Sequence, residues 1–120
     1  KLYIYGSNGE GWGKGGQAII RDEPNAFGIP TKVSPLEYMS DDDYEKNCMI
    51  IEIEIGNILY EQISKNYNSI VFPSQGLGTG LANMQKECPK TFLFLCERLL
   101  SEFGYNNIAN LTSKPLKYYK

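Results

Sequence analysis

Apolar side chains recur every three or four positions in two long stretches of the chain, a spacing typical of helices that bury one face. The first stretch predicts a helix over Asp41–Lys65, because Ser40 can cap its start and the aspartates that follow favour the positive end of the helix dipole. Within it, Ile51–Ile55 alternates apolar and acidic residues and would alone suit a strand. The cap and the longer period favour one helix. Its expected buried stripe is Tyr44, Cys48, Ile51, Ile55, Ile58 or Leu59, and Ile63.

The second helical stretch follows Pro89, which the first turn of a helix tolerates, and ends before Gly104, a common stop signal. Its apolar stripe is Phe92, Leu95, Cys96, Leu99, Leu100 and Phe103. A shorter helix is expected over Gly16–Arg21, because the Asp-Glu-Pro-Asn run that follows would end it.

Short runs of apolar β-forming residues predict strands at Leu2–Tyr5, Ala26–Pro30 and Ser69–Phe72, the first ended by a glycine and the second reaching Lys32. Val33–Tyr38 contains a proline and is interpreted as a connector. Alternating strands and helices predict an α/β fold with helices on the faces of a sheet.

The length of 120 residues suits one domain, expected over residues 1–104, followed by a weakly patterned extension over 105–120 with one further strand near Ile108–Leu111. No apolar run approaches the roughly 20 residues that span a bilayer, so no membrane association is expected. The net charge of −2 argues against general binding of duplex nucleic acid, which needs clustered lysine and arginine.

The residue types present narrow the possible chemistry. The chain has no histidine, which removes serine and cysteine triads with histidine and imidazole acid–base catalysis. Its three cysteines lack CxxC spacing, so a zinc site and a disulfide framework are not expected, and a reducing cytoplasm fits best. The run Asp41–Asp43 is explained by helix capping with fewer assumptions than by a metal site. No cofactor or metal is predicted.

Most of the glycines lie in two loops that each follow a predicted strand. Six of the twelve occur within Gly6–Gly16 and three more within Gly76–Gly80. Such strand-to-helix turns leave backbone N–H groups uncovered and allow an anion to approach the main chain. Two such turns at one end of a sheet predict a shared crevice that holds a diphosphate from both sides.

Several residues in and near these loops are candidate ligand contacts. Lys14 places a cation beside the helix start, next to Gly15, Gly16 and Gln17. Trp12 could either stack on a base or sugar or pin its loop to the core. In the second loop, Gly76, Gly78, Thr79 and Gly80 would expose consecutive amides, with Leu77 and Leu81 anchoring the loop from beneath. Lys32 is either a nucleophile or phosphate partner in the crevice or a solvated lysine.

Four segments together resemble a macrodomain, the α/β fold that binds ADP-ribose. Gly13–Ala18 resembles the small-residue segment that opens an early helix in the branch containing the terminal ADP-ribose glycohydrolases. The strand end Thr31-Lys32, the later Tyr44-Glu45, and Val71–Leu81 resemble further motifs of that branch. The segments GKGGQA, RDEPNAFGIPTK and FPSQGLGTGLA are similar to a family of small bacteriophage proteins.

The resemblance implies a macrodomain-like three-layer sandwich with a mixed central sheet, and an ADP-ribose-type ligand. Gly78, Thr79 and Gly80 would then hold one phosphate, and Gly15 and Gly16 the other, with Lys14 adding charge. Trp12 would cover the base or ribose, and Lys32, beside Thr31, would reach the distal ribose; Gly76, Gln17 and Leu81 complete the expected contacts. A viral protein of this kind would act in the host cytoplasm, where it would sequester or process a nucleotide.

Two alternatives remain open from the sequence. An ADP-ribosyl hydrolase would use Lys32 with an acid such as Asp22 or Glu23, although Ala82 stands where the glycohydrolase branch carries its catalytic aspartate. A virion-associated structural protein would instead keep the fold as a scaffold, with an empty crevice and a large apolar contact to a protein partner.

Overall fold

The computed structural model describes residues 1–107, and within them a four-stranded sheet has the order β3-β2-β1-β4. The strands are β1 (Leu2–Asn8), β2 (Ala26–Ser34), β3 (Glu37–Tyr38) and β4 (Ile70–Val71). β1 lies parallel to both β2 and β4, whereas β3 is antiparallel to β2. The α/β class and the mixed sheet predicted from the sequence are confirmed.

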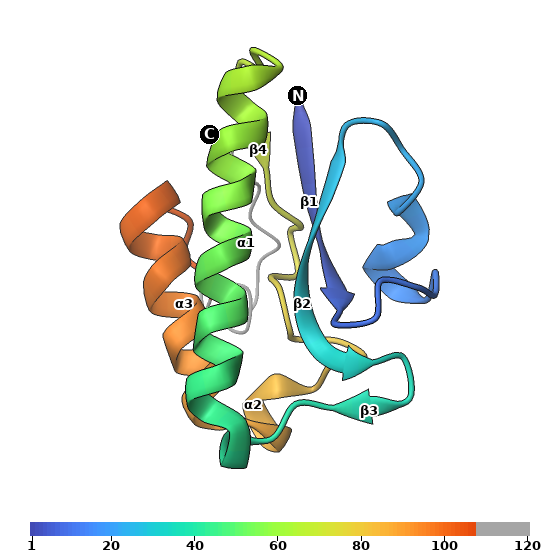
Figure 1. The fold of residues 1–120 in the computed structure, drawn as a ribbon, viewed down its shortest axis with the longest axis vertical. Helices are drawn as coiled ribbons and strands as arrows, with labels where there is room; N and C mark the ends of the chain where they lie inside the picture. The colour runs from blue at the N-terminus through green and yellow to red at the C-terminus, as the bar shows by residue number, and fades with distance from the viewer. Residues whose placement is uncertain (108–120) are drawn as a thin grey trace.

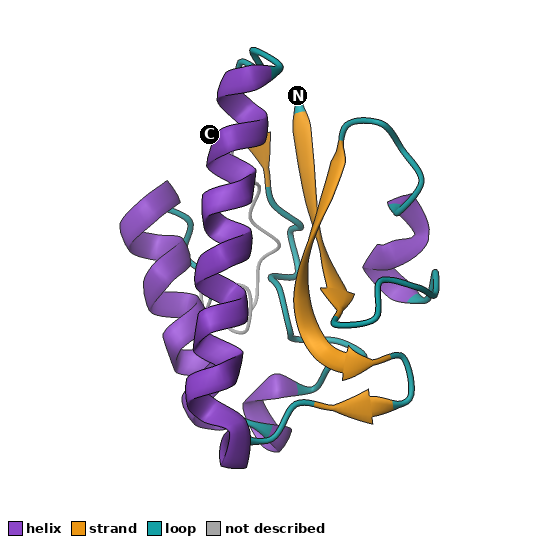
Figure 2. Ribbon diagram, viewed as in Figure 1, coloured by secondary structure: helices purple, strands orange, loops and turns teal. Residues whose placement is uncertain are grey.

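Two helices, α1 (Tyr44–Ser64) and α3 (Pro89–Phe103), pack against each other on one side of the sheet (Figure 1). The 3₁₀ segment η1 (Gly16–Ile20) lies on the other side (Figure 2). A second 3₁₀ turn, η2 (Asp41–Asp43), leads into α1, and the short helix α2 (Met84–Glu87) precedes α3. Within residues 1–107 no helix is both long and apolar enough to cross a membrane.

The main core lies between the sheet and the two long helices. From α1, Ile51, Ile55 and Ile58 enter it as predicted. α3 contributes Phe92, Leu95, Cys96, Leu99 and Phe103. Two members of the predicted stripes are exposed instead, Ile63 (79 %) and Leu100 (54 %). Ile63 lies five residues after buried Ile58, and Leu100 lies one residue after buried Leu99. At about 100° per residue, these steps turn the two side chains roughly 140° and 100° away from the core.

Polar residues cap the starts of η2 and α3, but Asp41 caps a different helix from the one predicted. The Ser40 hydroxyl accepts a hydrogen bond from the Asp42 N–H and so caps the 3₁₀ turn η2, whereas α1 itself begins only at Tyr44 without a side-chain cap. The Asp41 carboxylate instead caps α3, where it accepts from the backbone N–H groups of Lys90 and Thr91, both at 2.9 Å. α3 ends at Phe103 and is followed by Gly104, whose φ of 67° favours glycine.

Two strand predictions are wrong in their extent. β1 does not end at Gly6 but continues to Asn8, because Gly6 and Ser7 pair with residues of β2. The expected connector Val33–Tyr38 instead completes a hairpin, in which Ser34 pairs with Glu37 and Lys32 with Tyr38. Pro35 and Leu36 form the two-residue turn between the paired strands. The proline indicated a turn here, but the local sequence did not show that the flanking residues pair.

Two residues that follow the predicted domain, Tyr105 and Asn107, are buried against it. The ring of Tyr105 stacks on Phe72 with centroids 4.5 Å apart, and its hydroxyl donates to the Pro73 carbonyl at 2.7 Å. The side-chain amide of buried Asn107 bonds both the N–H and the carbonyl of Leu77. The strand predicted near residues 108–111 lies outside the described residues.

Candidate ligand-binding site

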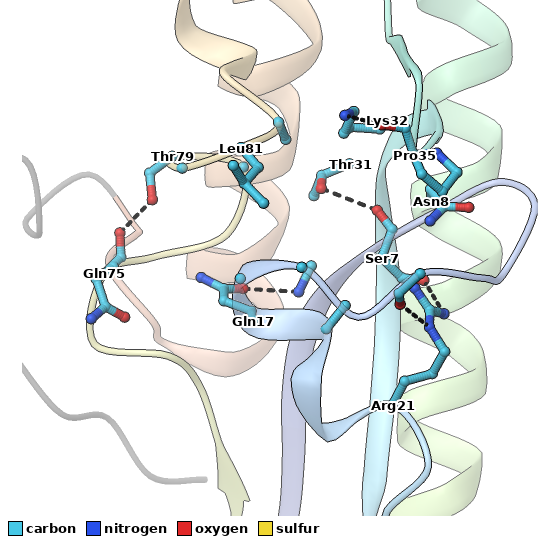
Figure 3. A pocket seen from close by; sticks show the side chains of 18 of the residues that line it. Ser7, Asn8, Gln17, Arg21, Thr31, Lys32, Pro35, Gln75, Thr79 and Leu81 are labelled. Carbon is cyan, nitrogen blue, oxygen red and sulfur yellow. Dashed lines mark hydrogen bonds between the residues drawn. The ribbon is translucent and has the colours of Figure 1, made fainter.

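The two glycine-rich loops meet at one cavity of ≈ 680 Å³ beyond the carboxyl ends of β1 and β2 (Figure 3). The chain leaves β1 toward η1 on one side of the sheet, and leaves β4 toward α3 on the other (Figure 1). A crevice at such a divergence of connections is the usual ligand site of open α/β sheets. Most predicted contact residues line it: Trp12, Gly15, Gly16, Gln17, Thr31, Lys32, Gly78, Thr79, Gly80 and Leu81.

The first loop is held in shape by Asn8 at the end of β1. Its carboxamide oxygen accepts from the N–H groups of Glu10 and Gly11, both at 2.9 Å, and its nitrogen donates to the Trp12 carbonyl at 2.7 Å. The indole of Trp12 is 52 % exposed and donates to the Glu10 carboxylate. Trp12 therefore lies at the edge of the cavity, and the alternative that it pins the loop to the core is wrong.

The second loop is anchored by Leu77, which is fully buried and bonded to Asn107. Gly78 has a φ of 77°, and an added Cβ would overlap the sulfur of Met84, so this position requires glycine. Gly80 differs, because a Cβ there would have no neighbour within 4 Å. Among the described residues, the N–H groups of Gly78, Thr79 and Gly80 have no hydrogen-bond acceptor. They remain available to an anion in the cavity.

Gln17 connects the two loops directly. Its side-chain oxygen accepts from the Gly6 N–H at 2.9 Å, and its nitrogen donates to the Gly76 carbonyl at 2.7 Å. Leu81 reinforces the contact from the second loop, because a Cβ on either Gly15 or Gly16 would come within 3.2 Å of its methyl group. Leu81 is 66 % exposed, so the expectation that it anchors its loop from beneath is wrong.

Two cations line the cavity, and only one was predicted. Arg21 donates from Nε to the Gly13 carbonyl and from Nη1 to the Ser7 hydroxyl, both at 2.8 Å. Lys32 donates to the Pro35 carbonyl at 2.8 Å. Neither forms an ion pair within the part of the chain that the structure describes. The described lining also contains no aspartate or glutamate. In a chain with net charge −2, this cavity is a local concentration of positive charge.

Two predicted contact residues lie outside the cavity lining. Lys14 forms an ion pair with Asp22, and its hydrogen bond and charge hold the pKa of that exposed carboxyl below the ordinary value. Gly76 is buried, and its carbonyl is bonded to Gln17. Asp22 and Glu23, the acids considered for hydrolysis, also do not line the cavity. Arg21 lines the cavity, whereas Lys14 does not.

Sequence reasoning missed four polar lining residues: Ser7, Asn8, Arg21 and Gln75. Ser7 and Asn8 were assigned to a loop, although Asn8 ahead of a Gly-Glu-Gly turn is a signal for side-chain bonding to the following amides. Arg21 directly follows η1, and its contact with the first loop exists only because η1 folds back beside that loop.

The fold and the site define an α/β domain with a positively charged, glycine-lined cavity at the carboxyl end of its parallel strands. Residues 1–98 match the model of DUF7831, a family of unknown function, and the chain belongs to that family. No curated protein and no solved structure matches the chain.

Proposed function

We propose that this protein binds a phosphate-containing nucleotide of the ADP-ribose type in the cavity between its two glycine-rich loops. One observation carries the proposal: the cavity combines uncovered backbone N–H groups and two cations without any carboxylate among the described residues that line it. Fixed amide dipoles and positive charge without an ion pair favour an anionic ligand, and a cavity of ≈ 680 Å³ has the size of sites that hold a small organic molecule.

The expected binding mode follows the positions of the groups. The N–H groups of Gly78, Thr79 and Gly80 would hold one phosphate, while Gly15 and Gly16 face the other with Arg21 supplying the charge. Trp12, exposed at the edge, offers its face to a base or ribose. Lys32 would reach the distal sugar. Gln17 was expected to contact the ligand, but both ends of its side-chain amide already bond the protein. Its proposed role is therefore to connect the two loops.

We also propose that the fold is a macrodomain-like three-layer sandwich. The long helices on one side of the mixed sheet and η1 on the other are compatible with it. Under this proposal the protein acts in the cytoplasm of a bacteriophage's host, where binding withdraws a host nucleotide from use. The sequence resemblance to phage proteins supports this role.

Binding is favoured over hydrolysis by the composition of the cavity. Hydrolysis of an ADP-ribosyl bond without histidine requires a carboxyl group or another acid–base group near the reacting atoms. The described lining contains no carboxyl group, and Ala82 lies in the wall at the position that, by the sequence resemblance, carries the acid in the glycohydrolase branch. The ammonium group of Lys32 is bonded to a carbonyl rather than to a base.

Titration calorimetry against ADP-ribose, NAD and cyclic nucleotides tests the proposal. We expect saturable heat with at least one of them, and at least a tenfold loss of affinity in Gly80→Val, because Gly80 lines the cavity and a Cβ there would meet no atom within 4 Å. Gly56→Val is the matched control, because its Cβ also meets open space but lies on α1, which contributes nothing to the cavity. Absence of heat with every ligand, or equal affinity in Gly80→Val, would contradict the proposal.

A further inference from the structure

Helix α1 has two apolar faces, and only one of them serves the core. On the other face, Met49, Ile53, Tyr60 and Ile63 expose 65, 58, 71 and 79 % of their surfaces. Together with Gly56, these residues are named here the α1 seam. Their spacing of four, three, four and three residues is the a/d spacing of helices that pair with another helix. Because Ile51, Ile55 and Ile58 already fill the core, the fold does not require the seam to be apolar.

The seam has two properties that suit a close helix partner. A Cβ at Gly56 would meet nothing within 4 Å, so the middle of the seam is flat and lets a second backbone approach. The large side chains lie on both sides of this point, seven residues away at Met49 and Ile63, and three or four away at Ile53 and Tyr60. The seam is therefore nearly symmetric about Gly56.

We propose that α1 pairs with α1 of a second copy of this chain, in an antiparallel crossing centred on Gly56. A two-fold axis through that point places Met49 opposite Ile63 of the second copy, and Ile53 within one residue of the level of Tyr60 of the second copy. Such self-complementarity is what a two-fold homodimer interface requires, because the same patch contributes both halves. A partner of a different sequence would not need this symmetry.

The seam's charge distribution favours the pairing. From Met49 to Ile63 its five positions carry no charged side chain. The acid nearest to its flank, Glu52, is turned toward α3, where it forms an ion pair with Arg98. Two copies can therefore approach without bringing unpaired carboxylates of this flank together.

The area that the pairing would bury indicates a weak dimer. Covering on the order of 100 Å² of each large seam side chain removes about 800 Å² over two copies, and flanking contacts bring the total near the roughly 1,000 Å² expected of a specific interface. Association should therefore depend on concentration. The cavity is lined by no residue of α1, so the two copies would keep their ligand sites open, and dimerisation can fail while the proposed function holds.

Sedimentation equilibrium of the full chain, from low micromolar to near millimolar concentration, tests the proposal. We expect a reversible monomer–dimer equilibrium, and at least a tenfold higher dissociation constant for Ile53→Glu, since it places a charge in the seam. Leu36→Glu is the matched control, because Leu36 is 88 % exposed in the β2–β3 turn and should leave the equilibrium unchanged. A chain that stays monomeric throughout, or equal effects of the two variants, would overturn the proposal.

Cysteine cross-linking tests the direction of the crossing. In a Cys48→Ser background, we expect Met49→Cys and Ile63→Cys proteins to form a disulfide with each other when they are mixed. Lys46→Cys mixed with Met49→Cys is the control and should give no product. Self-linked products alone would indicate parallel helices and overturn the antiparallel crossing, and absence of any product would overturn the pairing. Helical circular dichroism of each variant checks that it is folded.

Discussion

Gln17 and Gly76 are 59 residues apart in the chain and are joined by a hydrogen bond of 2.7 Å from the Gln17 side-chain nitrogen to the Gly76 carbonyl. The other end of the same amide accepts from the N–H of Gly6 in β1. One side chain therefore sets the distance between the two walls of the cavity, each of which follows a different strand of the sheet.

Replacing Gln17 by alanine should loosen the cavity. The change removes both hydrogen bonds and leaves the half-buried Gly6 N–H without its partner, which should lower the free energy of unfolding by about 1–3 kcal/mol. Urea denaturation measures this loss, and calorimetry should show weaker ligand binding because the walls are no longer held together. Gln85→Ala, on the exposed side of α2, is the control and should change the stability by less than about 0.5 kcal/mol. Equal stabilities of the two variants would contradict the connecting role.

Alanine should destabilise the protein at Gly78 but not at Gly80. At Gly78 the positive φ and the overlap with the Met84 sulfur should cost roughly 1–3 kcal/mol, because either the backbone or the packed methionine must shift. At Gly80 a methyl group meets no atom within 4 Å, and the free energy of unfolding should stay within about 0.5 kcal/mol of the wild-type value. Thermal unfolding of both variants checks the contrast, and an unstable Gly80→Ala protein would show that this glycine also has a packing role.

Trp12 should report ligand binding by its fluorescence. It is the one tryptophan of the chain and is half exposed at the edge of the cavity, so stacking on a base should quench and shift its emission. Titration should give the same dissociation constant as calorimetry. Trp12→Ala should bind at least tenfold more weakly, since one stacked base contributes about 1–3 kcal/mol. Emission that stays constant while calorimetry reaches saturation would exclude contact between the indole and the ligand.

Asp41 should make the fold sensitive to acid. Burial acts to raise the pKa of its carboxyl, but the hydrogen bonds from Lys90 and Thr91 outweigh that effect, so the pKa lies below the ordinary 3.8. The contribution to stability is then complete above about pH 3.8 and is lost as the pH falls through the lower folded-state pKa. Asp41→Asn should remove this part of the pH dependence, whereas Asp41→Ala should also cost about 1 kcal/mol at neutral pH through loss of the cap. Urea denaturation across pH 2–7 measures how the free energy of unfolding depends on pH. The same pH dependence in the wild type and in Asp41→Asn would contradict the assignment.

The cysteines should differ in their reactivity. Burial is the main cause that raises the pKa of the Cys88 thiol to about 11, and nearby Asp41 and Glu87 act in the same direction. At pH 8 such a thiol has about a hundredfold less thiolate than an ordinary cysteine, and its burial also blocks access. Timed alkylation with mass spectrometry should find Cys48 modified first and Cys88 only after unfolding. Rapid labelling of Cys88 in the native protein would show that this part of the core opens.

The two long helices could be predicted because their signals are local in the sequence. The two long helices begin near a capping serine or a proline, and α3 ends before a glycine; each of these signals lies in the sequence beside the element itself. The β3 strand could not be predicted in this way, because its two residues form a strand only by pairing with Lys32 and Ser34. The same reason explains why β1 was predicted too short, since Ser7 belongs to the strand through its partner in β2.

The site was predictable in its location and less so in its contacts. Glycine clusters after two strands indicated where backbone N–H groups would be uncovered, and both clusters line the cavity. The roles of Lys14 and Arg21 could not be assigned, because the choice depends on whether Asp22 neutralises one of them, and in the structure it pairs with Lys14. Gln17 was recognised as a site residue, but its use as a connection depends on a partner that the fold brings from the second loop.

The absence of acids from the described cavity wall has a consequence for the form in which a ligand would enter. Diphosphates commonly travel in cells as magnesium complexes, and a protein that accepts the complex usually offers one or two carboxylates to the ion. Here Arg21, Lys32 and the amides of the second loop would take over the neutralisation that magnesium provides. A diphosphate ligand would therefore bind without magnesium and would have to release the ion before it enters the cavity.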